Sequence, residues 1–207
     1  MVLSFSVIGA MMSRVIHWDR VAAVALIYFL GLGIGAHALD ALGGKGNKPW
    51  GMVFTRRQLW SAAASSLAAA YLVALYYIIR YAPLLAVIAV LEGFFVFAYN
   101  LEWFKGRFHT DRWFAFSWGF LPVCAGYVIQ TNALSIPLVP VALSMALLSV
   151  VEIKASRPYK ELKKRGAWLQ EEEQAQAARY EAILKSVSLG VIALGLGLLL
   201  FRLSIAP

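Results

Sequence analysis

Apolar residues form long uninterrupted blocks along the chain. Each block runs for roughly 16 to 23 residues and is rich in Leu, Ala, Gly and Phe. A helix of about 20 apolar residues crosses the hydrocarbon core of a bilayer, and the blocks lack the alternation of a barrel strand. We therefore expect an all-α membrane bundle of about seven transmembrane helices, at residues 2–17, 20–39, 59–80, 82–100, 113–131, 133–152 and 183–205.

The connections between these blocks alternate between short and long. The long ones are residues 40–58, 101–112 and 153–182. Because they alternate with short turns, all three are expected on one side of the membrane. Fifteen of the 19 Lys and Arg residues lie in or beside them, and the exceptions are Arg14, Arg20, Arg80 and Arg202. Basic connections stay in the cytoplasm, so the N-terminus is expected inside and the C-terminus outside.

The overall charge of +8 changes this picture little. In a soluble protein it would suggest nucleic acid as a partner, but topology explains it here and no nucleic-acid partner is expected. The single Cys124 rules out an intrachain disulfide. No basic residue precedes the first apolar run, unlike a signal peptide. We expect one integral domain over residues 1–207 in the cell membrane.

The third long connection, the cytoplasmic segment 153–182, has a helical pattern of its own. Residues 159–182 favour helix apart from Gly166, and Glu161 and Arg165 have the i,i+4 spacing of an ion pair. A broken apolar stripe follows the segment, formed by Leu162, Trp168, Leu169 and Tyr180. The pattern predicts a cytoplasmic helix on the membrane surface or over a cavity mouth; the alternative is a solvated connector.

A first candidate site lies at the end of the second block, in residues 30–51. Gly31 and Gly35 form a GxxxG pair that allows close helix contact. Beyond them come an imidazole, a carboxylate and two ammonium groups, those of His37, Asp40, Lys45 and Lys48. Such groups at a helix exit are suited to an anionic head group, bound directly or through a metal. The alternative is ordinary polarity at a membrane interface.

A second candidate site is the polar stretch 99–114, which aromatic residues frame. Its charged and polar members are Asn100, Glu102, Lys105, Arg107, His109, Asp111 and Arg112. The planar guanidinium groups of Arg107 and Arg112 suit phosphate, because each can bind two oxygens. The alternative is a short basic loop that only sets the topology.

Two further carboxylates stand out. Glu92 lies within an apolar block, where a carboxylate either lines a wet cavity or pathway or bonds to a neighbouring helix in its protonated form. Glu152 ends the sixth block and precedes a basic cluster that includes Arg157. The sequence contains no nucleophilic triad, zinc motif, P-loop or dinucleotide fingerprint.

Two segments resemble the UbiA-type intramembrane prenyltransferases. They are GAHALDALGGKG (residues 35–46) and RFHTDRWFAFSWGFLPVCAGYVIQT (residues 107–131), within a resemblance that spans residues 1–165. The family is an all-helical bundle in which acidic motifs after the second and sixth helices hold Mg²⁺ and a prenyl diphosphate. The resemblance implies that Asp40 and Glu152 are the metal ligands of an active member.

The chain departs from the family motifs at several positions. His37 stands where the first Asp of the first motif is expected, and Ala36 and Gly44 replace its Asn and last Asp. The residues after the sixth block, EIKASRPYKE, lack the second DxxxD motif. The resemblance therefore implies a degenerate prenyl-diphosphate site.

Three functions follow from these features. The first is a non-catalytic membrane subunit or lipid-binding protein, whose partners are membrane lipids, isoprenoids or other membrane subunits. The second is an active, divergent prenyltransferase that uses Mg²⁺ and a lipid or aromatic acceptor. The third is a small transporter with Glu92 as its ionisable pathway residue. The missing acidic residues favour the first.

Overall fold

The computed structural model describes residues 1–43, 50, 53–166 and 169–205, and the described residues are helical without any strand. The α-helices are α1 (Val2–Met11), α2 (Trp18–Tyr28), α3 (His37–Gly43), α5 (Arg56–Arg80), α6 (Leu85–Asn100), α7 (Asp111–Ala115), α8 (Leu121–Thr131), α9 (Leu138–Arg165) and α10 (Glu171–Ser204). The described residues also form two π-helical segments, η1 (Phe29–Ala36) and η3 (Phe116–Phe120), and a 3₁₀ turn, η2 (Phe104–Gly106). The predicted all-α fold class is confirmed.

Five helical stretches are long and apolar enough to cross a membrane, which indicates a membrane protein. They are Trp18–Gly43, Arg56–Arg80, Asp111–Thr131, Leu138–Arg165 and Glu171–Ser204. Two further apolar helices, α1 and α6, have 10 and 16 residues. The first predicted helix, 2–17, is therefore too long. It ends at Met11, and the Ser13 hydroxyl beyond it donates to the Val15 carbonyl (2.7 Å), a local bond that competes with helix.

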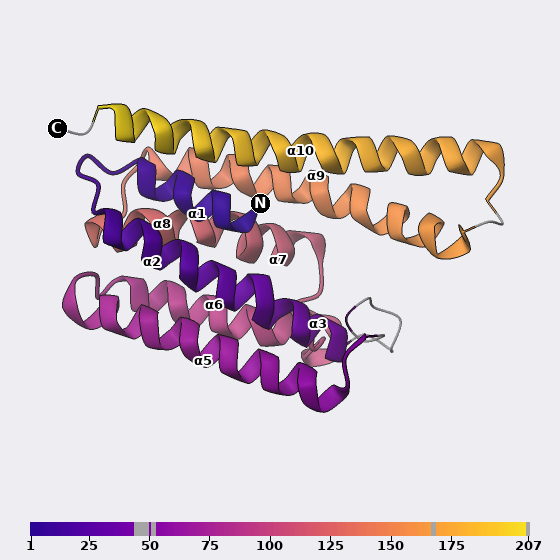
Figure 1. The fold of residues 1–207 in the computed structure, drawn as a ribbon, viewed down its shortest axis with the longest axis horizontal. Coiled ribbons are helices and arrows are strands. Elements are labelled where there is room, and N and C mark those ends of the chain that lie inside the picture. The colour runs from indigo at the N-terminus through magenta and orange to yellow at the C-terminus, as the bar shows by residue number, and fades with distance from the viewer. Residues whose placement is uncertain (44–49, 51–52, 167–168, 206–207) are drawn as a thin grey trace.

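The long connections meet at one end of the bundle, as their alternation predicts. The helices run side by side along the long axis of the molecule (Figure 1). The end of α3, the start of α5, the connection from α6 to α7 and the turn from α9 to α10 lie at the same end in Figure 1. The turns from α5 to α6 and from α8 to α9 lie at the other end.

No separate surface helix occurs in the described part of the segment 153–182, and that prediction is wrong. Residues up to Arg165 continue α9, because Glu, Leu, Lys and Arg are good helix formers. Gly166, at φ 54°, ends α9, and α10 begins at Glu171. The two long helices form a hairpin.

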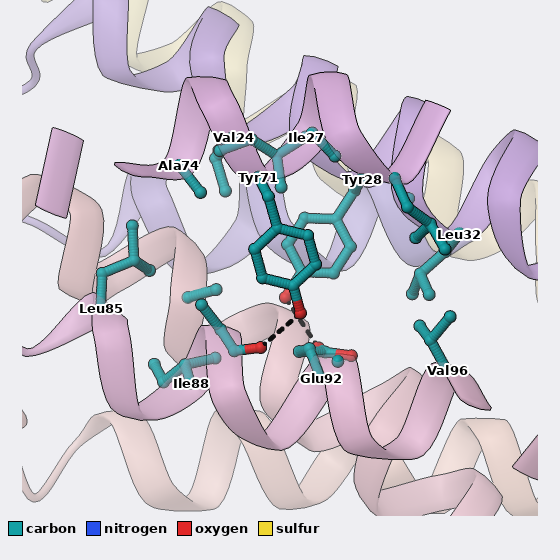
Figure 2. A pocket seen from close by; sticks show the side chains of 16 residues that line it. Val24, Ile27, Tyr28, Leu32, Tyr71, Ala74, Leu85, Ile88, Glu92 and Val96 are labelled. Carbon is teal, nitrogen blue, oxygen red and sulfur yellow. Dashed lines mark hydrogen bonds between the residues drawn. The ribbon is translucent and has the colours of Figure 1, made fainter. Parts of the chain in front are cut away.

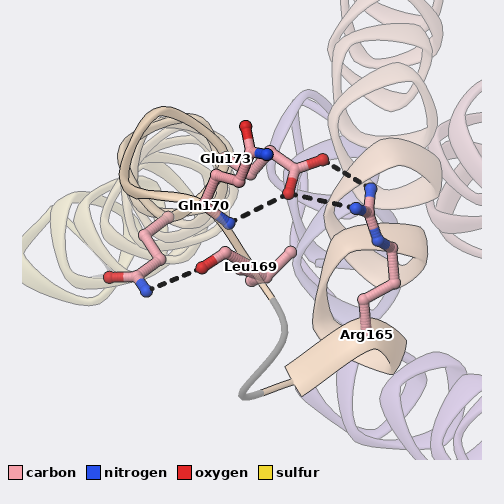
Figure 3. A network of polar contacts seen from close by, with 5 residues as sticks. Arg165, Leu169, Gln170 and Glu173 are labelled. Atoms are coloured by element: carbon pink, nitrogen blue, oxygen red, sulfur yellow. Dashed lines mark hydrogen bonds and ion pairs between the residues drawn. The ribbon is translucent and has the colours of Figure 1, made fainter.

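Polar contacts fix the turn of this hairpin (Figure 3). Both terminal nitrogens of Arg165 donate to the carboxylate of Glu173, at 2.5 and 3.1 Å. The same carboxylate accepts from the Gln170 backbone N–H (3.1 Å) and so caps α10. Arg165 therefore pairs across the turn with Glu173, and not with Glu161 as the i,i+4 spacing suggested.

The centre of the bundle is the crossing of α1 and α8. A Cβ placed on Gly9 would lie 2.0 Å from the Val123 carbonyl oxygen, and one on Gly126 would lie 1.8 Å from that of Ser6. Each helix thus presents a glycine to the backbone of the other. Small residues allow such close approach between membrane helices, and seven of the ten residues of α1 are buried there.

Two arginines of the opposite end act as helix caps. Arg202 donates from Nε to the Met11 carbonyl (2.9 Å) and from its terminal nitrogen to Ser13, beyond the end of α1. Arg20 donates to the Gln130 carbonyl (2.9 Å) in the last turn of α8. A cation satisfies terminal carbonyls and complements the helix dipole. These contacts explain two of the four basic residues that the charge asymmetry leaves at this end.

Candidate functional site

The described residues form an open hollow of about 810 Å³ between the start of α7 and the polar part of α9. It lies at the end of the bundle that gathers the long connections. The residues that line it are His109, Thr110, Asp111, Arg112, Trp113, Phe116 and Arg157. Two of the seven are arginines, five belong to the stretch that connects α6 with η3, and Phe116 is the first residue of η3.

Local hydrogen bonds hold the α7 side of the hollow. The Thr110 hydroxyl accepts from the Trp113 backbone N–H (3.4 Å) and caps α7. His109 bonds through Nδ1 to the Tyr99 carbonyl (2.9 Å), and its ring stacks on the Tyr99 ring at 4.3 Å between centroids. The end of α6 thus fixes the start of α7, where Asp111 and Arg112 lie.

An ion pair joins the two walls. Arg157 of α9 approaches the Asp111 carboxylate at 2.7 Å, and the two side chains are 43% and 29% exposed. Arg112 is exposed and makes no ion pair with any residue that the structure describes. With one carboxylate against two guanidinium groups, the hollow carries a net positive charge and can accept an anion.

Asp40 belongs to the same region. Asp40 of α3, Asp111 and Arg157 all lie close enough to the Tyr99 hydroxyl to interact with it electrostatically. Three predicted site residues from α3, α7 and α9 therefore act electrostatically on one tyrosine of α6.

An aromatic row leads from the hollow along η3. The Trp113 and Phe116 ring centroids are 6.0 Å apart, and Phe116 stacks on Phe120 at 5.7 Å. Phe95 of α6 contacts both Trp113 and Phe116, at 5.1 and 5.7 Å. The row offers an apolar surface that continues from a charged hollow.

Other predicted binding residues lie apart from the hollow. Asn100 is buried, and its side-chain amide donates to the Val96 carbonyl of its own helix (2.7 Å). His37 is exposed; it bonds to the Leu32 carbonyl (2.9 Å) and packs on Trp50. Arg107 is exposed and does not line the hollow. Lys45 and Lys48 lie outside the described residues.

The predicted metal ligands do not form a cluster. Glu152 lies about halfway along α9, where the charged groups that act on it are the Met1 amino group and Lys160. Within the described ranges, no three His, Cys, Asp or Glu side chains come together in a way that could hold a metal ion. Magnesium usually takes several oxygen ligands, so these donors do not fit the magnesium centre that the resemblance implies.

Glu92 lies in a second, apolar cavity of about 70 Å³ between α2, α5 and α6 (Figure 2). Its Oε1 accepts a hydrogen bond from the Tyr28 hydroxyl of α2 (2.9 Å). The sequence left two alternatives for Glu92, a wet cavity or pathway and a bond to a neighbouring helix. The structure contains the bond to a neighbouring helix. Glu92 does not line the charged hollow, so the structure separates it from the other predicted site residues.

Sequence reasoning named His109 as a polar member of the second candidate site, but it did not select Thr110 or Trp113 as binding residues. All three lie in the polar stretch 99–114, whose density of charge in an apolar chain was the available signal. Their roles depend on the turn between α6 and α7. Glu102, Phe104 and Lys105 adopt positive φ there (54°, 56° and 59°). Glu, Phe and Lys rarely adopt positive φ, so the sequence does not predict this backbone conformation.

Comparisons with protein families, with characterised proteins and with solved structures find no match for this chain. A fold alone would in any case not assign an activity. The function therefore has to be inferred from the chemistry of the hollow and its surroundings.

Proposed function

We propose that this protein binds a membrane amphiphile with a phosphate or diphosphate head group and does not transfer its chain. The hollow holds the head group, and the aromatic row of Trp113, Phe116 and Phe120 contacts the apolar tail. The single observation that carries the proposal is the presence of Arg112 and Arg157 in one open hollow next to this row.

Guanidinium chemistry supports a phosphate ligand over a carboxylate. A guanidinium group presents a planar fork that can bind two oxygens, and a diphosphate offers enough oxygens for two such forks. Arg112 is available without breaking an ion pair to a described residue. The Arg157 side chain is 43% exposed. It can therefore bind the ligand in place of Asp111, or bind the ligand and Asp111 together.

The UbiA-like segments are then a degenerate version of a prenyl-diphosphate site. In the family, carboxylates bind the diphosphate through Mg²⁺. Here the first motif keeps Asp40, and the hollow supplies arginines. Arginines neutralise a bound anion, but they do not supply the metal bridge that assists departure of a diphosphate. An isoprenoid or lipid that is held but not activated fits this set of groups.

An active transferase is the second candidate, because Asp40 interacts electrostatically with Tyr99, whose ring stacks on His109 of the hollow. Tyr99 also interacts with Asp111 and Arg157. In an active enzyme, Asp40 and Asp111 would be the carboxylates nearest to the head group. This candidate requires Mg²⁺, which the first does not.

The proposed topology has seven membrane helices, of which six, α6 among them, cross the membrane and α1 enters it only partway. A 16-residue helix spans about 24 Å and a 10-residue helix about 15 Å. α1 nevertheless packs on α8, α10 and α2 inside the bundle. With the positive-inside rule, the end with the charged hollow faces the cytoplasm.

Sidedness is tested by cysteine labelling in intact cells after replacement of the buried Cys124. A cysteine at Gln170, in the turn between α9 and α10, is expected to resist an impermeant maleimide until the cells are opened. A cysteine at Asn132, in the turn at the opposite end, is the matched control and is expected to react from outside. The reverse pattern would show that the orientation is inverted.

The function is tested with the purified protein in nanodiscs. We expect saturable binding of farnesyl or geranylgeranyl diphosphate, and no prenyl transfer above background to aromatic or glycerol-phosphate acceptors in excess Mg²⁺. Turnover that depends on Mg²⁺ and is abolished by Asp40→Ala would establish the transferase candidate instead. Failure to bind either diphosphate would refute both.

A further inference from the structure

The apolar cavity around Glu92 contains an unsatisfied polar atom. The residues that line it come from α2, η1, α5, α6 and α8, and none of the 16 is basic. Glu92 Oε1 accepts from Tyr28, but Oε2 is shielded from solvent and has no hydrogen-bond partner among the described residues. Buried polar atoms are nearly always paired, so a partner for this oxygen is expected from outside the described residues.

The local structure keeps this oxygen from being satisfied. Tyr71, the other nearby tyrosine, donates its hydroxyl to the Ala89 carbonyl (2.8 Å) and so is not directed to Glu92. It reaches that carbonyl only because residue 93 is glycine, since a Cβ there would lie 2.0 Å from the hydroxyl oxygen. The two hydroxyls that flank the carboxyl are therefore both committed.

The backbone around the cavity is also irregular. Tyr28 is the last residue of α2 before the π-helical segment η1, and Gly31 and Leu32 of this segment line the cavity. π-helical insertions are rare and frequently lie at functional sites. The unpaired oxygen, the cavity and the π-helical wall are three separate features that coincide at one place.

We propose that this cavity binds the hydroxyl end of a neutral, lipid-soluble alcohol, with Glu92 as the hydrogen-bond partner. With no basic side chain among the 16 residues that line the cavity, the apolar surroundings favour the uncharged form of the carboxyl. An uncharged carboxyl can donate or accept at Oε2, and a hydroxyl can do the reverse in either case. An ether only accepts, and an alkane does neither. The site is distinct from the charged hollow and does not depend on the function proposed for it.

The ligand enters from the bilayer. Tyr71 at the edge of the cavity is 40% exposed, and Leu72 and Val90 on the flanking helices are about 70% exposed on the outer surface. The remaining lining is apolar, from Val24, Ile27, Leu67 and Leu85 among others. An alkyl or isoprenoid chain therefore follows the hydroxyl without placing further polar groups in the cavity.

The test is photolabelling of the protein in nanodiscs with a diazirine-bearing octanol, followed by peptide mapping. Labels are expected on residues 24–32, 67–74 and 85–96. 1-Decanol should displace the label at a membrane concentration about tenfold lower than decane, since the alkane can neither donate to Oε2 nor accept from it. Equal competition by the two compounds overturns the proposal, as does stronger competition by decylamine, which would indicate a charged carboxylate. This comparison uses the native protein.

Variants give an independent measurement. Glu92→Leu is expected to reduce labelling of the cavity about tenfold while the protein stays folded, and Glu92→Gln, which keeps a donor and an acceptor, should retain most of it. Val90→Ala, on the outer surface of the same helix, is the matched control and should label normally. Gly31→Leu fills the cavity from another helix and should also remove the label. Undiminished labelling in folded Glu92→Leu and Gly31→Leu refutes the site.

Discussion

Replacement of Gly126 by alanine is expected to destabilise the protein by about 1–3 kcal/mol, because the new Cβ overpacks the bundle centre. That Cβ would lie 1.8 Å from the backbone oxygen of Ser6 and 2.9 Å from the Ala10 nitrogen. Both obstacles are backbone atoms, so relief requires α1 to move away from α8. For a chain of this size the loss corresponds to a fall in Tm of roughly 2–12 °C, measured by thermal unfolding in detergent.

Gly190→Ala is the matched control for this change. Gly190 also lies in a helix, but a Cβ there meets nothing within 4 Å, so the alanine should stabilise α10 by up to about 1 kcal/mol. Gly9→Ala attacks the same crossing from α1, against the Val123 carbonyl. The two central changes should therefore be less than additive when combined. If Gly126→Ala is as stable as Gly190→Ala, the close crossing of α1 and α8 is refuted.

Much of the fold could be predicted from hydrophobic blocks alone. The predicted helix 59–80 corresponds to α5, 113–131 to the stretch that ends with α8, and 20–39 to the stretch Trp18–Gly43. A block of apolar residues marks a membrane helix because hydrocarbon offers its backbone no other hydrogen-bond partner. The alternation of long and short connections likewise predicted which helix ends lie together.

Helix ends outside the apolar blocks were harder to predict. Residues 153–165 are polar, and a hydropathy pattern cannot separate a continued helix from a new one. Their good helix formers extend α9, and the pairing of Arg165 with Glu173 turns the chain back. The π-helical segments η1 and η3 were also missed, since their extra residue per turn leaves no mark on an apolar sequence.

The site was predictable only in part. Asp111, Arg112 and Arg157 line one hollow, and their role in binding stays a prediction. Asn100 and Glu92 are both polar residues of the same apolar block. In the structure, Asn100 bonds to its own helix, whereas Glu92 lies in an apolar cavity. Which way a side chain points depends on helix rotation and on the turn before α7, and spacing in the sequence does not determine either.

Removal of both arginines of the hollow is expected to lower the affinity for a prenyl diphosphate by at least about 100-fold. A hydrogen bond to a charged group contributes about 1.5–3 kcal/mol, so each loss corresponds to about tenfold or more. The measurement is a binding titration of Arg112→Gln/Arg157→Gln in nanodiscs. The matched control is Arg56→Gln/Arg57→Gln, which removes the same charge from exposed residues at the start of α5. Its effect should disappear in 300 mM salt, where charges further apart than several Å are screened.

Asp111→Asn separates direct anion binding from metal binding, because the two predict opposite signs. Asp111 is the ion-pair partner of Arg157 at 2.7 Å. If the arginines bind the head group directly, loss of this carboxylate removes a competing anion, and the affinity for the diphosphate should rise severalfold with or without Mg²⁺. If the carboxylates of the hollow bind a metal that bridges to the diphosphate, the same change removes a ligand, and affinity should fall only when Mg²⁺ is present. A fall of this second kind would contradict the arginine-based site and favour an active transferase.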